Sequence, residues 1–141
     1  MPMNSELKRT IIMENYQNPK NRGLIDDDSY DKIVTNSKSC IDQIDLEIKL
    51  KDNIVIDVRF DGEACAICTS STSILINLII GKTKEEALNI IDSFENMINE
   101  KEYDEEILKE AIVYQDISKE PNRINCATLT WKGMKDYLNK K

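Results

Sequence analysis

The amino-acid sequence predicts an α+β fold, in which a small three-stranded antiparallel sheet is covered by helices. Two runs of apolar–polar alternation, over residues 44–50 and 54–60, are joined by a short polar turn, as in a β-hairpin. Most of the remaining chain carries apolar residues at helical spacing, and helices can cover the apolar face of the sheet. The 141 residues, without internal repeats or linkers, fit a single domain over residues 1–141.

Residues 5–17 are predicted to form the first helix. Ser5 can cap this helix, and Asn18-Pro19 should end it, because the residue before a proline disfavours helical backbone. The apolar residues at helical spacing between these signals are Leu7, Ile11, Ile12 and Tyr16. Residues 18–29 are rich in turn formers and predict a loop, after which residues 30–34 indicate a short first strand.

The two hairpin strands are each predicted to bury one face. The residues expected on the buried face are Ile44, Leu46, Ile48 and Leu50 in one strand and Ile54, Ile56, Val58 and Phe60 in the other. The polar residues that alternate with them, such as Asp45 and Glu47, are expected on the solvent face.

The next two predicted helices have clear boundaries. One covers residues 67–80 and ends at Gly81, and its small polar stretch 69–73 should let a neighbouring element pack closely. The other follows Thr83 and Glu86, which fit a capping box. Its apolar stripe consists of Ala87, Ile90, Ile91, Phe94, Met97 and Ile98.

The C-terminal part is predicted to hold a solvated connection and two more helices. Residues 100–106 are acidic, and residues 107–114 indicate a short helix. Pro121 suits the first position of the last helix, because its missing N–H costs nothing there. The residues of that helix spaced for burial are Ile124, Leu129, Met134 and Leu138, and Trp131 is expected in the core.

Charge and composition exclude several classes of function. Asp and Glu number 26 against 19 Lys and Arg, giving a net charge of −7, which argues against a nucleic-acid partner. The chain has no histidine, so catalytic triads and cysteine–histidine sites are excluded, and any metal must be held by sulfur and oxygen. Neither a signal peptide nor a membrane span is recognisable, so a cytoplasmic protein without membrane contact is expected.

Three cysteines and one aspartate are candidate metal ligands. Cys40 lies two residues before Asp42, and side chains at this spacing in extended chain point to the same side. Cys65 precedes the amides that open a helix, and Cys126 lies near the start of the last helix. With Asp42 they would complete a tetrahedral zinc shell. Arg123 is spaced to bring its guanidinium to the face that carries Cys126.

The residues alone leave other interpretations of the cysteines open. Any of them could be an inert core thiol, and two structural disulfides would account for all four. Cys65 and Cys68 have the spacing of a redox dithiol. Cys68 could also replace Asp42 as the fourth ligand, although a small residue facing the core is the preferred interpretation.

Four segments resemble the SufU branch of the IscU/NifU-like iron–sulfur assembly proteins. They are residues 18–23 (NPKNRG), the pair Cys40-x-Asp42, residues 62–65 (GEAC) and residues 123–131 (RINCATLTW). The resemblance extends from about residue 7 to residue 138 and implies a SufE/NifU-like fold. The long interval between Cys65 and Cys126 favours SufU over IscU-type scaffolds, as does Asn125, where those scaffolds carry a histidine.

The resemblance implies a zinc site made of Cys40, Asp42, Cys65 and Cys126. It also implies a sulfurtransferase-like activity: the protein would accept persulfide sulfur from a SufS-type cysteine desulfurase, activate that enzyme, and pass the sulfur to downstream iron–sulfur assembly proteins. Cys40 would be the acceptor, and Arg123 would help to hold negative charge. The alternatives are a scaffold that holds a nascent [2Fe–2S] cluster on the same cysteines, and a zinc-stabilised adaptor without sulfur chemistry.

The sequence departs from the family pattern at two positions beside these cysteines. Ile41 and Ala64 stand where the family has glycine. A β-branched residue is strained wherever glycine takes a positive φ, so a positive φ at residue 41 would require the loop or the metal site to differ from the family pattern.

Overall fold

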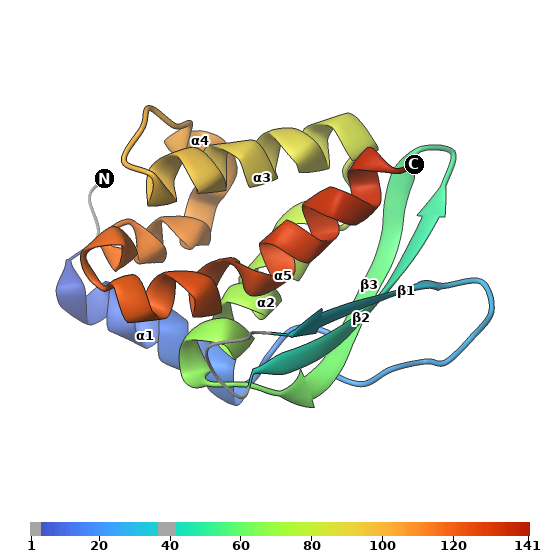
Figure 1. The fold of residues 1–141 in the computed structure, drawn as a ribbon, viewed down its shortest axis with the longest axis horizontal. Coiled ribbons are helices and arrows are strands. Elements are labelled where there is room, and N and C mark those ends of the chain that lie inside the picture. The colour runs from blue at the N-terminus through green and yellow to red at the C-terminus, as the bar shows by residue number, and fades with distance from the viewer. Residues whose placement is uncertain (1–3, 37–41) are drawn as a thin grey trace.

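The computed structural model describes residues 4–36 and 42–141, and it confirms the α+β fold. The described chain contains α1 (Ser5–Gln17), β1 (Asp31–Asn36), β2 (Gln43–Lys51), β3 (Ile54–Glu63), α2 (Ala66–Ile79), α3 (Lys84–Ile98), α4 (Glu105–Leu108), η1 (Lys109–Tyr114), η2 (Ile117–Lys119) and α5 (Pro121–Asn139), where η marks a 3-10 helix. The sheet has the order β1-β2-β3, and both pairings are antiparallel. Figure 1 shows the helices gathered to one side of this sheet. None of the helices in the described ranges is long and apolar enough to cross a membrane.

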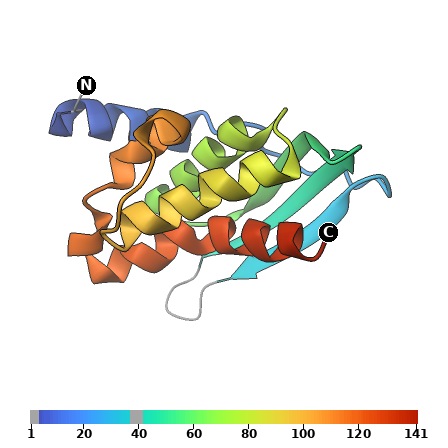
Figure 2. The ribbon, with the colours of Figure 1, turned by 90° about the horizontal axis from the view of Figure 1, so that it is seen from above.

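The helical layer is centred on α2, which packs between α1 and α5 (Figure 2). The small polar stretch at residues 69–73 is buried, as expected, and it supplies hydrogen bonds to the neighbouring helix. The Ser71 hydroxyl donates to the Ala127 carbonyl at 2.6 Å and accepts from the Trp131 indole N–H at 2.8 Å. Small hydroxyl side chains therefore allow α2 and α5 to approach closely while their buried polar atoms remain paired.

Helix α3 contributes its predicted apolar stripe to the core. Thr83 and Glu86 form the expected capping box, and all six predicted stripe residues are buried. Trp131 is fully buried and stacks on Phe94, with ring centroids 3.7 Å apart and planes 9° apart. The aromatic pair therefore joins α3 to α5 in the centre of the helical layer.

Several local predictions were wrong. The helix α1 has the predicted bounds, but Asn4 caps it instead of Ser5, with its Oδ1 accepting the Leu7 N–H at 2.7 Å. Ile54 and Ile56 are exposed rather than buried, because a bulge lies opposite Lys49 and Leu50. An extra residue in one strand exchanges its two faces, so Val55 enters the core in their place. Residues 107–114 form the end of α4 followed by a 3-10 helix instead of one α-helix.

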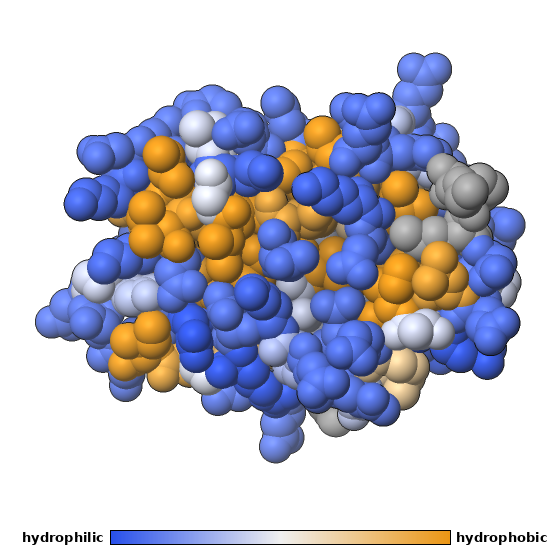
Figure 3. Space-filling model, turned by 180° about the vertical axis from the view of Figure 1, so that it is seen from behind, coloured by the Kyte–Doolittle hydropathy of each residue, from blue (hydrophilic) through white to orange (hydrophobic). Residues whose placement is uncertain are grey.

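The polar face of the sheet is covered in part by the loop between α1 and β1. Glu47, expected in solvent, is fully buried, and its carboxylate accepts the backbone N–H groups of Ile25 and Asp26 at 2.7 and 3.0 Å. The same loop bonds to the edge of β3, where Gly23 N–H donates to the Phe60 carbonyl at 2.7 Å. Apolar side chains still reach the surface in places, as the rear view in Figure 3 shows.

Candidate metal centre

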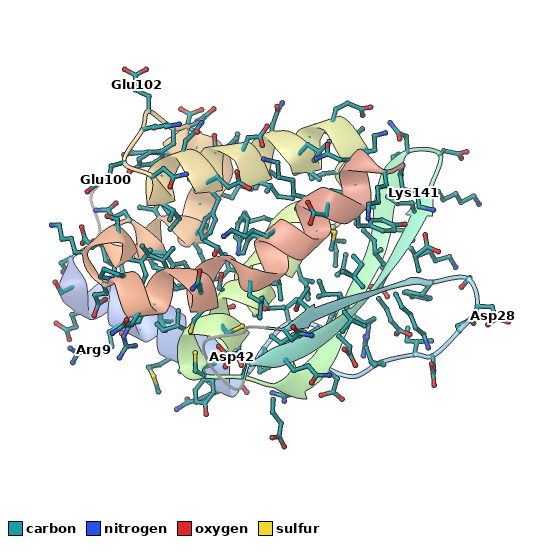
Figure 4. The ribbon with its side chains drawn as sticks, in the orientation of Figure 1. Arg9, Asp28, Asp42, Glu100, Glu102 and Lys141 are labelled. Atoms are coloured by element: carbon teal, nitrogen blue, oxygen red, sulfur yellow. The ribbon has the colours of Figure 1, made fainter. Side chains whose placement is uncertain are left out.

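Asp42 lies immediately before β2 and is only 2 % exposed. Its Oδ1 atom accepts the backbone N–H of Cys65 at 2.7 Å, and its Oδ2 atom lies 3.5 Å from the Cys65 sulfur. Figure 4 shows Asp42 where the sheet meets the first turn of α2. One carboxylate oxygen therefore fixes the backbone at the start of α2, and the other faces the thiol.

Gly62 brings Cys65 to this place. Its φ is +138°, and a Cβ atom there would lie 2.2 Å from the backbone oxygen of Gln43. Only glycine therefore allows the end of β3 to lie so close to the start of β2. The chain then reaches Cys65, which was expected just before the amides that open a helix. It is the N-cap residue of α2, and its sulfur accepts the Cys68 N–H at 3.4 Å.

Cys126 completes the group from α5. The ligand atoms of Asp42, Cys65 and Cys126 all lie within 4.8 Å of one another. Zinc–sulfur bonds of about 2.3 Å in a tetrahedron separate two sulfurs by about 3.8 Å. Side-chain shifts of about 1 Å would therefore close these three donors around one metal ion. Two thiols and a carboxylate form a donor set that suits zinc and, without histidine, matches the sulfur–oxygen site expected from the sequence.

The other cysteines have different positions. Cys40 and Ile41 lie outside the described residues. Cys68 is fully buried, packs in the hydrophobic core, and is not part of the described three-residue group. This placement agrees with the preferred interpretation of Cys68 as a small residue that faces the core.

A groove of about 570 Å³ adjoins the exposed Cys65. It is lined by residues from α1, the start of α2, the 3-10 helices and α5, including Arg9, Ile12, Cys65, Tyr114, Ile117 and Arg123. Arg123 is half exposed, and its Nε atom lies 3.7 Å from a Glu120 carboxylate oxygen. Arg123 therefore shares this groove with Cys65. The contribution of α1 could not be predicted, because no sequence signal showed which element lies beside Cys65.

Tyr114 is buried against the first turns of α2 and forms a hydrogen bond to that helix. Its hydroxyl lies 2.5 Å from the Ser70 hydroxyl, and Ser70 itself donates to the Ile67 carbonyl, so Tyr114 is the donor of the short bond. Burial raises the pKa of Tyr114, and the nearby sulfurs of Cys68 and Cys65 add to this effect. Tyr114 therefore stays protonated beneath the first turns of the helix that carries Cys65.

Comparison with known proteins identifies the family of this chain. The family model for the NifU-like N-terminal domain matches residues 7–131. The zinc-dependent sulfurtransferase SufU of Bacillus subtilis (strain 168) is 40 % identical over 135 residues, which cover 95 % of this chain and 90 % of that protein. The iron–sulfur cluster assembly scaffold protein IscU of Streptococcus pyogenes serotype M1 is 31 % identical over 137 residues, covering 96 % and 85 %.

A solved structure shares the fold. The crystal structure of a candidate iron–sulfur cluster assembly scaffold protein for the SUF system, from Fervidobacterium islandicum AW-1, aligns with a TM-score of 0.80 and 32 % identity. The alignment covers 91 % of this chain and 93 % of that one. On these grounds the chain belongs to the family of NifU-like N-terminal domains, among the SufU- and IscU-like proteins of iron–sulfur cluster assembly.

Proposed function

We propose that this protein is a zinc-dependent sulfur-transfer protein, which accepts persulfide sulfur from a SufS-type cysteine desulfurase and passes it to downstream iron–sulfur assembly proteins. The observation that carries the proposal is the convergence of Asp42, Cys65 and Cys126, of which the exposed Cys65 also lines a groove. The similarity to a zinc-dependent SufU over 95 % of the chain supports the same assignment.

The donor set fits zinc. Cys65 and Cys126 would supply thiolates and Asp42 a carboxylate, and Cys40, two residues before Asp42, is the proposed fourth ligand. Three thiolates and one carboxylate carry four negative charges against the two positive charges of zinc. Zinc would keep the cysteine sulfurs deprotonated at neutral pH, whereas a thiol of pKa about 8.5 is mostly protonated there.

The residues of the site have separate roles in the proposed transfer. The Cys40 sulfur attacks the outer sulfur of the desulfurase persulfide, and the thiolate of the desulfurase leaves, as in disulfide exchange. Asp42 holds the backbone of Cys65 in place through its Oδ1 atom. Arg123, in the groove beside Cys65, offers a cation to the negative charge of an approaching persulfide.

Two measurements test this proposal. Elemental mass spectrometry of the reductively purified protein should find about one zinc per chain. Addition of the protein to a SufS-type desulfurase should stimulate alanine formation from cysteine, and Cys40→Ala should abolish the stimulation. Stimulation that persists in Cys40→Ala would remove Cys40 from the acceptor role.

A second candidate function is a scaffold for a nascent [2Fe–2S] cluster on the same cysteines. The IscU similarity over 96 % of the chain favours it. Anaerobic reconstitution with iron and sulfide would then give visible absorption that survives gel filtration. Purified protein that contains iron and sulfide instead of zinc would decide for the scaffold.

A further inference from the structure

Cys68 lies where it can react with Cys65, although it lies outside the three-residue metal group. Cys65 is the N-cap residue of α2, and Cys68 is the third residue of the helix. The Cys68 backbone N–H donates to the Cys65 sulfur at 3.4 Å. The Cys65 sulfur therefore contacts the backbone of the first helical turn at the residue that carries the Cys68 side chain.

The two thiols differ in their access to solvent. Cys65 is exposed and lines the groove, whereas Cys68 is fully buried. A sulfur donor that enters the groove therefore reaches Cys65 before it can reach Cys68. Cys68 is protected from such a donor, but it remains one helical turn from the sulfur that the donor would modify.

We propose that Cys68 is the resolving thiol of Cys65, and that the pair releases transferred sulfur as sulfide. This inference rests on the proposed sulfur-transfer function. The Cys65 sulfur attacks the outer sulfur of the persulfide that Cys40 has accepted, the Cys40 thiolate leaves, and Cys65 then carries the persulfide. The Cys68 sulfur attacks the inner sulfur of this persulfide, a Cys65–Cys68 disulfide forms, and the outer sulfur leaves.

The reaction balances without another reductant. The S–S bond of the persulfide breaks and the S–S bond of the disulfide forms. The proton of the Cys68 thiol and the proton of the persulfide leave with the outer sulfur as hydrogen sulfide. The two cysteine thiols are oxidised and the sulfane sulfur is reduced to sulfide, the oxidation state that iron–sulfur clusters contain. A dithiol reductant then restores the pair.

The geometry requires only a local change. Side chains three residues apart on a helix have Cβ atoms about 5–6 Å apart, and a disulfide needs about 3.5–4.5 Å. The N-cap residue lies outside the regular helix, so a shift of about 1 Å at Cys65 leaves the packed part of α2 in place and lengthens the hydrogen bond from its N–H to Asp42. Cys126, whose sulfur lies within 4.8 Å of the Cys65 sulfur, is the competing partner, and a bond to it would join α2 to a different helix, α5.

The test uses the full chain, as purified and again after treatment with a chelator, under anaerobic conditions. One equivalent of inorganic polysulfide serves as the sulfane donor, so no desulfurase is needed. The shorter polysulfide or sulfide that leaves in the first transfer is removed by rapid desalting. Sulfide released afterwards is measured colorimetrically, and the cysteine products are mapped by mass spectrometry of proteolytic peptides. We expect wild-type protein to release sulfide and to form the Cys65–Cys68 disulfide.

Cys68→Ser should keep the persulfide on Cys65 and release sulfide at least about tenfold more slowly, because the intramolecular thiol is lost. Cys68→Ala serves as a second variant, and thermal unfolding shows whether each is folded. Thr69→Ser, a neighbouring buried change on the same helix, should behave like wild type. A Cys65–Cys126 disulfide, unmodified Cys65 in both samples, or undiminished sulfide release from folded Cys68 variants would overturn the proposal. If the protein fails to stimulate the desulfurase but still forms the Cys65–Cys68 disulfide with polysulfide, the proposed function is contradicted and the role of Cys68 is not.

Discussion

The two oxygens of Asp42 have different neighbours. A buried carboxylate is costly unless it is hydrogen-bonded, and Oδ1 meets this requirement through the Cys65 backbone N–H. Oδ2 faces the Cys65 thiol and belongs to the group of candidate ligands. The structural and metal-binding contributions of this residue can therefore be separated by substitution.

Asp42→Asn keeps an oxygen that can accept the Cys65 N–H but removes the negative charge. We expect zinc affinity to fall about 10- to 100-fold, while the free energy of unfolding of the metal-free protein changes by less than about 1 kcal/mol. Competition with a chromophoric chelator measures the affinity. Glu63→Gln removes an exposed charge from the nearby end of β3 and should leave the affinity unchanged. Equal losses in both variants would mean that only long-range charge matters.

At the residue scale, the sequence predicted the positions of residues that are set by neighbouring residues. It missed the burial of residues that are covered by segments far away in the chain. The N-cap position of Cys65 follows from its place between a strand and a helix. The burial of Glu47 does not follow from its strand, because the loop that covers it lies more than 20 positions earlier. Alternation places a side chain on one face of a sheet but says nothing of what covers that face.

The connection from β3 to α2 depends on one glycine. A Cβ atom at Gly62 would clash with the Gln43 backbone oxygen, and its φ of +138° is strained for any L side chain. Relief of this clash would separate the ends of β2 and β3, and with them Asp42 and Cys65. This element therefore couples the stability of the sheet to the geometry of the candidate metal centre.

Gly62→Ala should lower the free energy of unfolding by about 2–4 kcal/mol and also weaken zinc binding. Gly81→Ala is the matched control, because Gly81 also has a positive φ, +85°, but a Cβ atom there would meet nothing within 4 Å. It should cost only about 1 kcal/mol and leave zinc binding unchanged. Urea unfolding and chelator competition measure the two effects. A similar loss in both variants would show that φ, and not the clash, limits Gly62.

Elements with strong local signals were predicted closely, and irregular ones were not. The capping box at Thr83 and the apolar stripe behind it fixed α3. The bulge in the hairpin escaped prediction because Ile54 and Ile56 continue the alternation of Val58 and Phe60 without interruption. Nothing in the pattern marks the residue at which the strand changes face.

At the scale of the whole molecule, three tyrosines join segments far apart in the chain. The Tyr30 hydroxyl donates to Asp57 at 2.6 Å, which raises the pKa of Tyr30 to about 12. Burial and the hydrogen bond to Asp31 raise the pKa of Tyr137, and burial raises that of Tyr114. Just above pH 10, therefore, the folded protein keeps three phenolic protons that the unfolded chain, with a tyrosine pKa near 10.0, has begun to release.

This difference predicts that stability falls at high pH. Below about pH 10 both states keep the phenolic protons, and the stabilisation is fully present. Above about pH 10 the unfolded state binds fewer protons than the folded state, so the free energy of unfolding decreases as pH rises toward the folded pKa values. Buried Tyr114 contributes up to about 1.4 kcal/mol per pH unit, and the more exposed Tyr30 and Tyr137 contribute less because solvent screens them.

Urea unfolding between pH 8 and about pH 11.5, followed by the fluorescence of buried Trp131, measures this slope. Tyr114→Phe should lower the stability by about 1 kcal/mol at pH 8, because the hydroxyl no longer pairs with Ser70. The same variant should lose less stability than wild type above about pH 10, since it has no phenolic proton to release on unfolding at this position. The difference between the two curves cancels every other titrating group. Parallel curves would show that Tyr114 is not held protonated by the fold, and that the start of α2 is more accessible to water than its packing indicates.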